Sequence, residues 1–121
     1  MKLDAGAIRE IALGYPEVRE DHPWGESAFK VREKTFVFLG ERPEGVSFSV
    51  KLPLSRDFAL SFDGTEPTHY GLGKSGWVTV TVGARTKIPP DVVRAWIDES
   101  FRAVAPKKVV ATLPGERKEK R

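Results

Sequence analysis

Residues 27–52 hold three strand-like stretches whose connections are too short for a parallel crossover. Residues 27–32 alternate apolar with basic side chains, residues 35–39 form a continuous β-prone run, and residues 46–52 alternate apolar with polar side chains. A parallel pair needs a connection of about a dozen residues or more, whereas antiparallel neighbours need only a tight turn. This spacing restricts the chain to a sheet built from hairpins.

The run at residues 35–39 is apolar on both faces, so we expect it near the centre of the sheet. Glu33 and Lys34 are predicted to form the tight turn before this run, and residues 40–45 the loop after it. Residues 77–82 alternate without a break and are predicted to be a fourth strand. The stretch 63–76 is rich in turn residues and is predicted to be a loop.

Two helices are predicted at the ends of the chain. Asp4 can cap a first helix of about ten residues that ends at Gly14. Pro90 and Asp91 can begin the last helix, because proline and an acidic residue both suit a first turn. Its apolar stripe comprises Val93, Trp96, Ile97, Phe101 and Val104. Ser55 is predicted to cap a short helical turn, and another short turn is expected after Pro106.

These elements predict one α+β domain over residues 1–113, with an antiparallel sheet of about four to five strands packed by N- and C-terminal helices. We expect the helices to cover one face of the sheet. Lys30, Arg32 and Lys51 would then project from the other face. Residues 114–121 are predicted to be a basic, frayed tail.

Composition excludes several classes of site. The chain has no cysteine, so it has no disulfide, no thiolate nucleophile and no cysteine-rich zinc site. We find neither the apolar core of a signal peptide nor an apolar run that would span a membrane, and therefore expect a cytoplasmic protein without membrane contact.

No catalytic constellation is recognisable. His22 and His69 lie on separate loops without metal-ligand spacing, and no serine has a nucleophile-elbow context. Residues 71–76 read GLGKSG, but Thr68 stands where the first glycine of a phosphate-binding loop belongs, and a strand follows. We therefore expect no enzymatic activity, no metal site and no cofactor.

Charge is concentrated near the C-terminus. Residues 107–121 carry a net charge of +4 against +3 for the whole chain, so the other 106 residues sum to −1. The predicted phosphate contacts are Lys30, Arg32, Lys51, Lys74, Lys107 and Lys108, with Trp77 beside them as a groove residue. Arg117, Lys118, Lys120 and Arg121 extend this basic set into the tail.

Short motifs in a fixed order carry a resemblance to a known family. They are AFKVR at 28–32, VKL at 50–52, GKSGWV at 73–78 and SFR at 100–102. Together they resemble the MmcQ/YjbR-like family over residues 7–113. Lys34 and Phe36 fit its F-x-V-x-x-K-x-F strand, and Lys74 and Trp77 fit its K-x-G-W element. Gly76 replaces a histidine found in many relatives, so no role of that histidine transfers.

The resemblance implies a fold similar to frataxin-like and secretion-chaperone-like proteins, with a curved antiparallel sheet backed by terminal helices. The family is often labelled DNA-binding, a label that rests on fold comparison. Our first hypothesis is accordingly a DNA-binding accessory protein of low sequence specificity, since no helix offers base-reading side chains.

Two alternatives stay open at this point. The domain could be an adaptor or chaperone-like module that binds another protein, or a second copy of itself, through the open sheet face or an edge strand. A small-molecule pocket beneath residues 71–77 is a third hypothesis, because glycines allow close approach and Trp77 offers an apolar wall.

Overall fold

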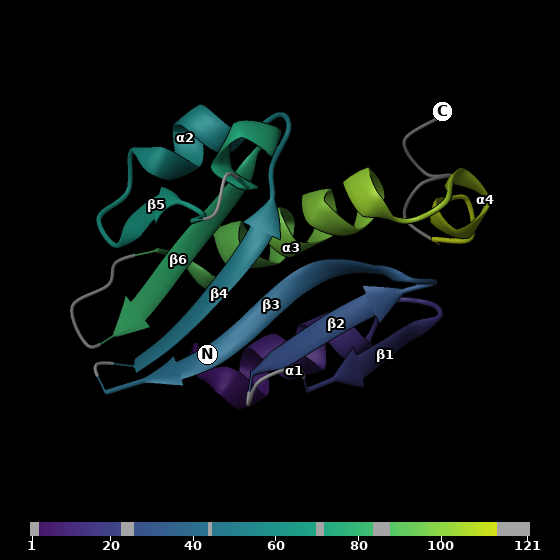
Figure 1. Cartoon of the computed structure of the whole chain (residues 1–121), viewed down its shortest axis with the longest axis horizontal. Coiled ribbons are helices and arrows are strands. Elements are labelled where there is room, and N and C mark those ends of the chain that lie inside the picture. The colour runs from purple at the N-terminus through teal and green to yellow at the C-terminus, as the bar shows by residue number, and fades with distance from the viewer. Residues whose placement is uncertain (1–2, 23–25, 44, 70–71, 84–87, 114–121) are drawn as a thin grey trace.

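Six antiparallel strands form one sheet in the computed structural model, which describes residues 3–22, 26–43, 45–69, 72–83 and 88–113. The strands are β1 (Val18–Asp21), β2 (Ser27–Val31), β3 (Lys34–Arg42), β4 (Gly45–Lys51), β5 (Thr65–Pro67) and β6 (Trp77–Gly83). Their order across the sheet is β1-β2-β3-β4-β6-β5 (Figure 1). The predicted α+β class is confirmed, and β3 lies near the centre as expected.

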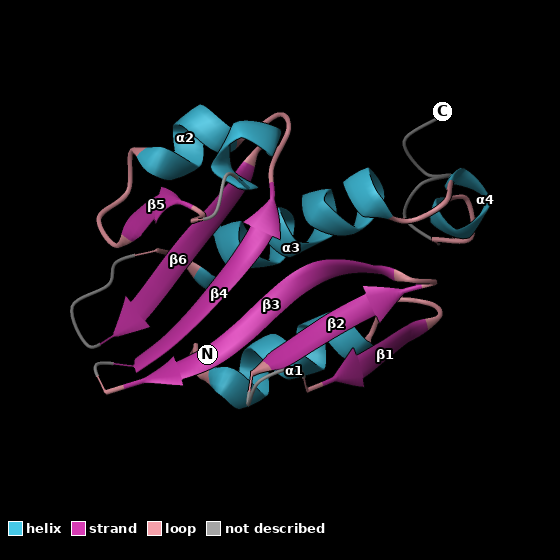
Figure 2. Ribbon diagram, viewed as in Figure 1, coloured by secondary structure: helices cyan, strands magenta, loops and turns pink. Residues whose placement is uncertain are grey.

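Two long helices lie on one face of this sheet, behind it in the view of Figure 2. They are α1 (Ala5–Leu13) and α3 (Pro90–Val104). Two short helices, α2 (Arg56–Leu60) and α4 (Lys107–Val110), lie at the periphery, and the 3₁₀ helix η2 (Leu72–Ser75) precedes β6. Among the described residues, none of these helices has the length and apolar character needed to cross a membrane.

Both predicted long helices begin where the sequence indicates. The Asp4 carboxylate accepts a hydrogen bond from the Ala7 N–H at 2.9 Å, and α1 ends at the Gly14 cap. Pro90 opens α3, whose stripe of Val93, Trp96, Ile97, Ser100 and Phe101 is buried against the sheet. Burial of such a stripe supplies most of the stability of an amphipathic helix.

Ser100 joins α3 to the backbone of two strands. Its hydroxyl donates to the Phe36 carbonyl at 2.6 Å and accepts from the Lys51 N–H at 2.8 Å. The register between β2 and β3 shifts near this point, which leaves Phe36 as the extra residue of a bulge. One fully buried hydroxyl therefore replaces a direct bond between β3 and β4.

The two edge strands were not predicted from the sequence. β1 is short and reads VRED, and β5 has three residues that include Pro67. Short, charged or proline-containing edges are typical of natural sheets, because they discourage pairing with other chains. Because of the same features, these two strands lack the alternation of apolar residues by which strands are predicted from a sequence.

Several predicted boundaries were also wrong. The turn after β2 comprises Arg32 and Glu33, not Glu33 and Lys34, and Arg32 adopts a left-handed conformation with φ of 59°. β3 continues to Arg42 into the stretch predicted as a loop. The predicted loop 63–76 contains β5 and η2. Ser55 precedes α2 but makes no side-chain capping bond.

The predicted tail, 114–121, lies outside the described residues, as does Trp24.

Ser100→Ala should lower the free energy of unfolding by about 1–3 kcal/mol, because a buried N–H and a buried carbonyl lose their partner. Ser55→Ala is the matched control, since its hydroxyl makes no capping bond. Urea unfolding followed by circular dichroism measures both variants. Equal stability of the two variants would show that the Ser100 bridge contributes nothing.

Candidate functional site

The seven predicted site residues separate into three places in the fold. Lys51, Lys74 and Trp77 lie where β4 ends and β6 begins, whereas Lys30 lies in the middle of β2. Arg32, Lys107 and Lys108 lie at the far end of the sheet, where the β2–β3 turn approaches α4 (Figure 1). The predicted patch is therefore not continuous across the sheet face.

A basic end is formed by the β2–β3 turn, the start of β1 and α4. Its residues are the cations Arg19, Arg32, Lys34, Lys107 and Lys108 and the acids Glu17 and Glu33. Arg32 Nε lies 2.5 Å from Glu17 Oε1, and Arg19 Nη2 lies 3.4 Å from Glu33 Oε1. After these two pairs are formed, Lys34, Lys107 and Lys108 leave this end with an excess of three positive charges.

The Glu17–Arg32 pair ties two turns together. Both residues adopt left-handed backbone conformations, with φ of 63° at Glu17 and 59° at Arg32. The hydrogen bond from Arg32, together with the charges of Arg32 and Lys108, holds the pKa of Glu17 below its usual value. The charge of Lys108 lowers the pKa of Glu17 because α4 lies close to this turn. Non-glycine residues in this region are uncommon and mark positions that the surrounding fold holds in place.

Arg19 was missed by the sequence interpretation because β1 was not predicted. Lys34 was predicted to lie in the turn, and it is instead the first residue of β3. In the sequence, the order of the basic residues around the hairpin was the signal that could have indicated the basic end.

Lys30 is on the open sheet face, as predicted, but an acid neutralises it. Its Nζ lies 3.2 Å from Asp21 Oδ2 on the neighbouring strand. The bonds from the His22 N–H and from Lys30 hold the pKa of Asp21 below its usual value. Arg32 was predicted for this face and is in the turn instead.

Trp77 is packed into the fold and is only 8% exposed. Its ring centroid lies 5.5 Å from that of Phe38, on the same face of the sheet as Lys51. Base stacking needs an accessible aromatic face, and Trp77 offers little. Lys51 and Lys74 near it are the accessible cations of this second group.

The rest of the open face consists mainly of small polar residues. The hydroxyls of Ser49, Thr79 and Thr68 form a chain with separations of 2.8 and 2.9 Å. Ser47 and Ser49, which are polar positions of the alternation in β4, are buried. These hydroxyls satisfy one another, so they stabilise the sheet and leave few groups for a partner.

Glu20 is the centre of a second polar cluster, on the helix side of β1. Its carboxylate accepts from Ser27 Oγ at 2.7 Å and from Arg9 Nε at 3.1 Å, and His22 Nε2 lies 3.2 Å away. Burial opposes ionisation of Glu20, but the bonds from Ser27 and Arg9 outweigh it and lower its pKa overall. Within the described ranges no group of three or more histidine and acidic side chains is arranged to hold a metal ion.

Comparison with known proteins identifies the family of the chain. The family model described as YjbR matches residues 13–103. A structural-genomics target from Pseudomonas syringae is 17% identical and superimposes with a TM-score of 0.68, over 84% of this chain and 98% of that one. Deinococcus radiodurans protein DR2400, a DUF419 domain, is 20% identical with a TM-score of 0.68, over 96% and 86%. The curated proteins contain no significant match.

Glu20→Gln should flatten the pH dependence of stability at acid pH. The pKa of Glu20 lies below its ordinary 4.5 in the folded chain, so the carboxylate stabilises the fold above that pH. This contribution is lost as the pH falls through the folded pKa. The wild-type melting temperature should therefore fall more steeply than that of the variant between about pH 5 and pH 2. Glu33→Gln, at an exposed carboxylate, is the control, and parallel curves for Glu20→Gln and wild type would contradict the assignment.

Proposed function

The chain belongs to the YjbR family, and we propose that this member is a DNA-binding accessory protein of low sequence specificity that contacts phosphates through its basic end. The observation that carries the proposal is the local excess of charge. Five cations face two acids at the β2–β3 turn and α4, while the whole chain has a net charge of only +3. Neutralisation of phosphates supplies most of the free energy of non-specific DNA binding.

The lysines of α4 are best placed for this role. Lys107 and Lys108 are exposed, and neither forms an ion pair with another described residue. An unpaired lysine can meet a phosphate without first breaking a contact within the protein. Arg32 and Arg19 would have to exchange Glu17 and Glu33 for phosphates, so we expect them to contribute less.

Low specificity follows from the shape of the helices. The apolar stripe of α3 is buried against the sheet, and α4 is only four residues long. Reading of base edges in the major groove requires an exposed helix or ribbon with several polar side chains. The basic end offers point charges instead, which bind the phosphate backbone regardless of sequence.

Replacement of the α4 lysines tests the proposal. Fluorescence anisotropy with a labelled duplex should give a dissociation constant that rises steeply with salt. Lys107→Gln with Lys108→Gln should weaken binding several-fold and reduce the slope of log K against log salt by about 2, because each phosphate contact contributes about 0.9.

Lys51→Gln with Lys74→Gln is the matched control, because it removes the same charge at the other predicted site. Binding that is lost with this pair but unchanged by the α4 pair would place the contact near Trp77. Absence of binding at low salt would reject DNA as the partner.

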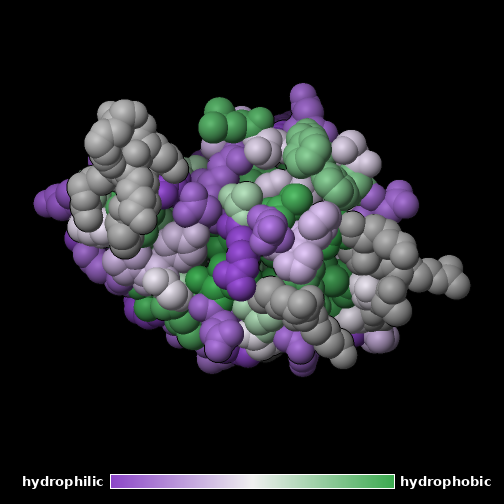
Figure 3. Space-filling model, turned by 180° about the vertical axis from the view of Figure 1, so that it is seen from behind, coloured by the Kyte–Doolittle hydropathy of each residue, from purple (hydrophilic) through white to green (hydrophobic). Residues whose placement is uncertain are grey.

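A protein-binding role is the second candidate, favoured by the exposed apolar residues around α2. Leu54 is 89% exposed and Phe58 is 56% exposed, and Figure 3 shows apolar surface over α2 at the upper edge of the molecule. The Glu99 carboxylate accepts from the N–H groups of Leu54 and Ser55 at 2.7 and 3.0 Å. The exposed leucine thus lies on a fixed backbone. The large exposed apolar residues of the described chain lie off the sheet, so this surface differs from the predicted sheet face.

Self-association tests the second candidate directly. Sedimentation velocity from about 10 µM to about 500 µM should detect a dimer if this patch pairs with a copy of itself. Leu54→Ser with Phe58→Ser should then restore the monomer, whereas Leu13→Ser, at an exposed leucine of α1, should not. A wild-type monomer over the whole range would reject self-association.

A further inference from the structure

The two ion pairs at the basic end differ in how firmly they are held. Arg32 donates two bonds to Glu17, from Nε to Oε1 at 2.5 Å and from Nη2 to Oε2 at 3.3 Å. Both residues occupy left-handed turn positions that the surrounding fold holds in place. A guanidinium joined to a carboxylate by two bonds is the stronger form of such a pair. Exchange of Glu17 for a phosphate would therefore break two bonds at once.

The pair between Arg19 and Glu33 is weaker. A single contact joins Arg19 Nη2 to Glu33 Oε1 at 3.4 Å, and the side chain of Glu33 is 90% exposed. Arg19 makes no other hydrogen bond or ion pair with a described residue, so its Nε and Nη1 donors remain available. One long contact between exposed side chains contributes little to stability. Glu33 can therefore leave Arg19 for water without disturbing the sheet.

The register of β1 and β2 places a second positive charge beside Arg19. Arg19 is the direct partner of Lys30 on the open face, and like charges at directly opposed positions repel each other. Lys30 is balanced by a close acid, since its Nζ lies 3.2 Å from Asp21 Oδ2. Arg19 has only the long contact with Glu33. An additional anion would therefore reduce the repulsion most if it bound at Arg19.

Arg19 also lies within reach of a DNA strand that is bound at the basic end. Its partner Lys30 is paired in turn with Thr35, the neighbour of Lys34 in β3. Two strand spacings, about 10 Å, therefore separate Arg19 from Thr35 across the sheet. Each strand of B-DNA carries one phosphate per about 3.4 Å of helix axis, so a few consecutive phosphates span this distance.

We propose that a phosphate of the bound DNA displaces Glu33 from Arg19, which becomes a further phosphate contact of the basic end. Arg32 keeps Glu17 and acts as a positioning residue that holds the turn. This inference rests on the proposed DNA binding and distinguishes the arginine that exchanges its partner from the one that does not. The freed guanidinium of Arg19 offers parallel N–H donors, which suit the two free oxygens of a phosphodiester. Glu33 is then the exchangeable counter-ion of the unbound protein.

Two charge-neutral double variants test the inference by fluorescence anisotropy with a labelled duplex. Arg19→Gln with Glu33→Gln should weaken binding about two- to threefold and lower the slope of log K against log salt by about 0.9, because one phosphate contact is lost. Glu17→Gln with Arg32→Gln should lower the melting temperature but leave the slope and the dissociation constant unchanged. Both variants keep the net charge of +3, so total charge cannot account for a difference between them.

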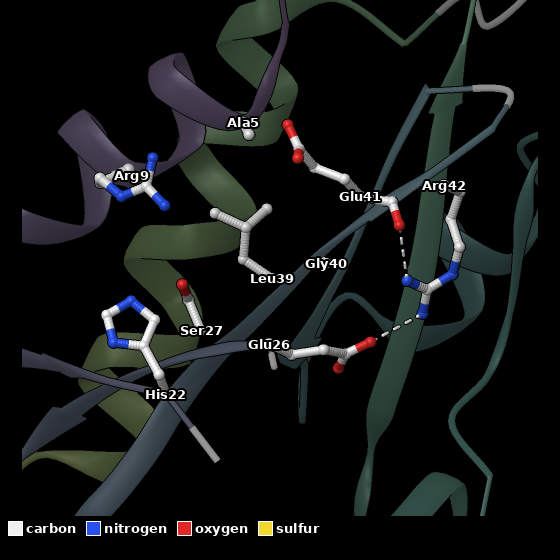
Figure 4. A pocket seen from close by; sticks show the side chains of 9 residues that line it. All are labelled: Ala5, Arg9, His22, Glu26, Ser27, Leu39, Gly40, Glu41 and Arg42. Carbon is white, nitrogen blue, oxygen red and sulfur yellow. Dashed lines mark hydrogen bonds and ion pairs between the residues drawn. The ribbon is translucent and has the colours of Figure 1, made fainter. Parts of the chain in front are cut away.

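A third neutral variant controls for the loss of an ion pair elsewhere on the surface. Glu26→Gln with Arg42→Gln removes a pair at the opposite end of the β2–β3 hairpin, beside the pocket drawn in Figure 4. There Arg42 Nη2 bonds Glu26 Oε2 at 3.1 Å. Because this pair lies outside the basic end, its removal should leave DNA binding and the salt slope unchanged.

The wild-type chain provides a test that does not depend on the stability of any variant. In ¹⁵N-labelled protein, the Nε–H signal of Arg19 should shift far more than that of Arg32 when the duplex is added. Equal shifts of the two signals, or an unchanged salt slope after Arg19→Gln with Glu33→Gln, would overturn the exchange while DNA binding stands. Absence of binding by the wild-type chain would overturn both the exchange and the proposed function.

Discussion

The bridge made by the Ser100 hydroxyl organises the rest of the structure. At Phe36 a bulge breaks the regular register between β2 and β3, and the N–H of Lys51 and the carbonyl of Phe36 are joined through the serine. Without this hydroxyl, two backbone groups would be buried without partners, which is among the more costly defects in a small domain. The bridge also attaches α3 to the two central strands, so packing of the helix and register of the sheet depend on each other.

The bridge has a consequence for charge. Lys34 lies two residues before Phe36, and Lys51 is itself part of the bridge, so the positions of both lysines follow from Ser100. The β2–β3 hairpin then carries the basic end at its turn. A slip of one residue in this hairpin would move every side chain to the opposite face. The bulge at Phe36 and the Ser100 bridge both oppose this shift of register.

Much of the fold could be predicted because local signals agreed with the final packing. The Asp4 cap, the stripe of α3 and the alternation in β4 and β6 each determine an element without help from distant residues. β1 and β5 could not be predicted, because an edge strand pairs on one side only and tolerates charged residues and proline. The C-terminal end of β3 was not predicted, for a similar reason. Gly40 and Arg42 are typical of a loop by residue type, and only their pairing with β4 shows that they belong to a strand.

The site was predictable only as a set of residue types. Sequence indicates that Lys30, Arg32 and Lys51 are exposed, but not that Asp21 neutralises the first or that Glu17 pairs with the second. Ion pairs between residues nine to fifteen positions apart depend on register, and register depends on the bulge. A basic isoelectric point of 9.3 therefore says little about a binding surface until the cations that form ion pairs are subtracted from the number of positive charges. Of the accessible cations, Lys34, Lys107 and Lys108 gather at the end where α4 meets the hairpin, whereas Lys51 and Lys74 lie near Trp77. The position of the charges, and not their total, is therefore what supports the proposed phosphate-binding surface.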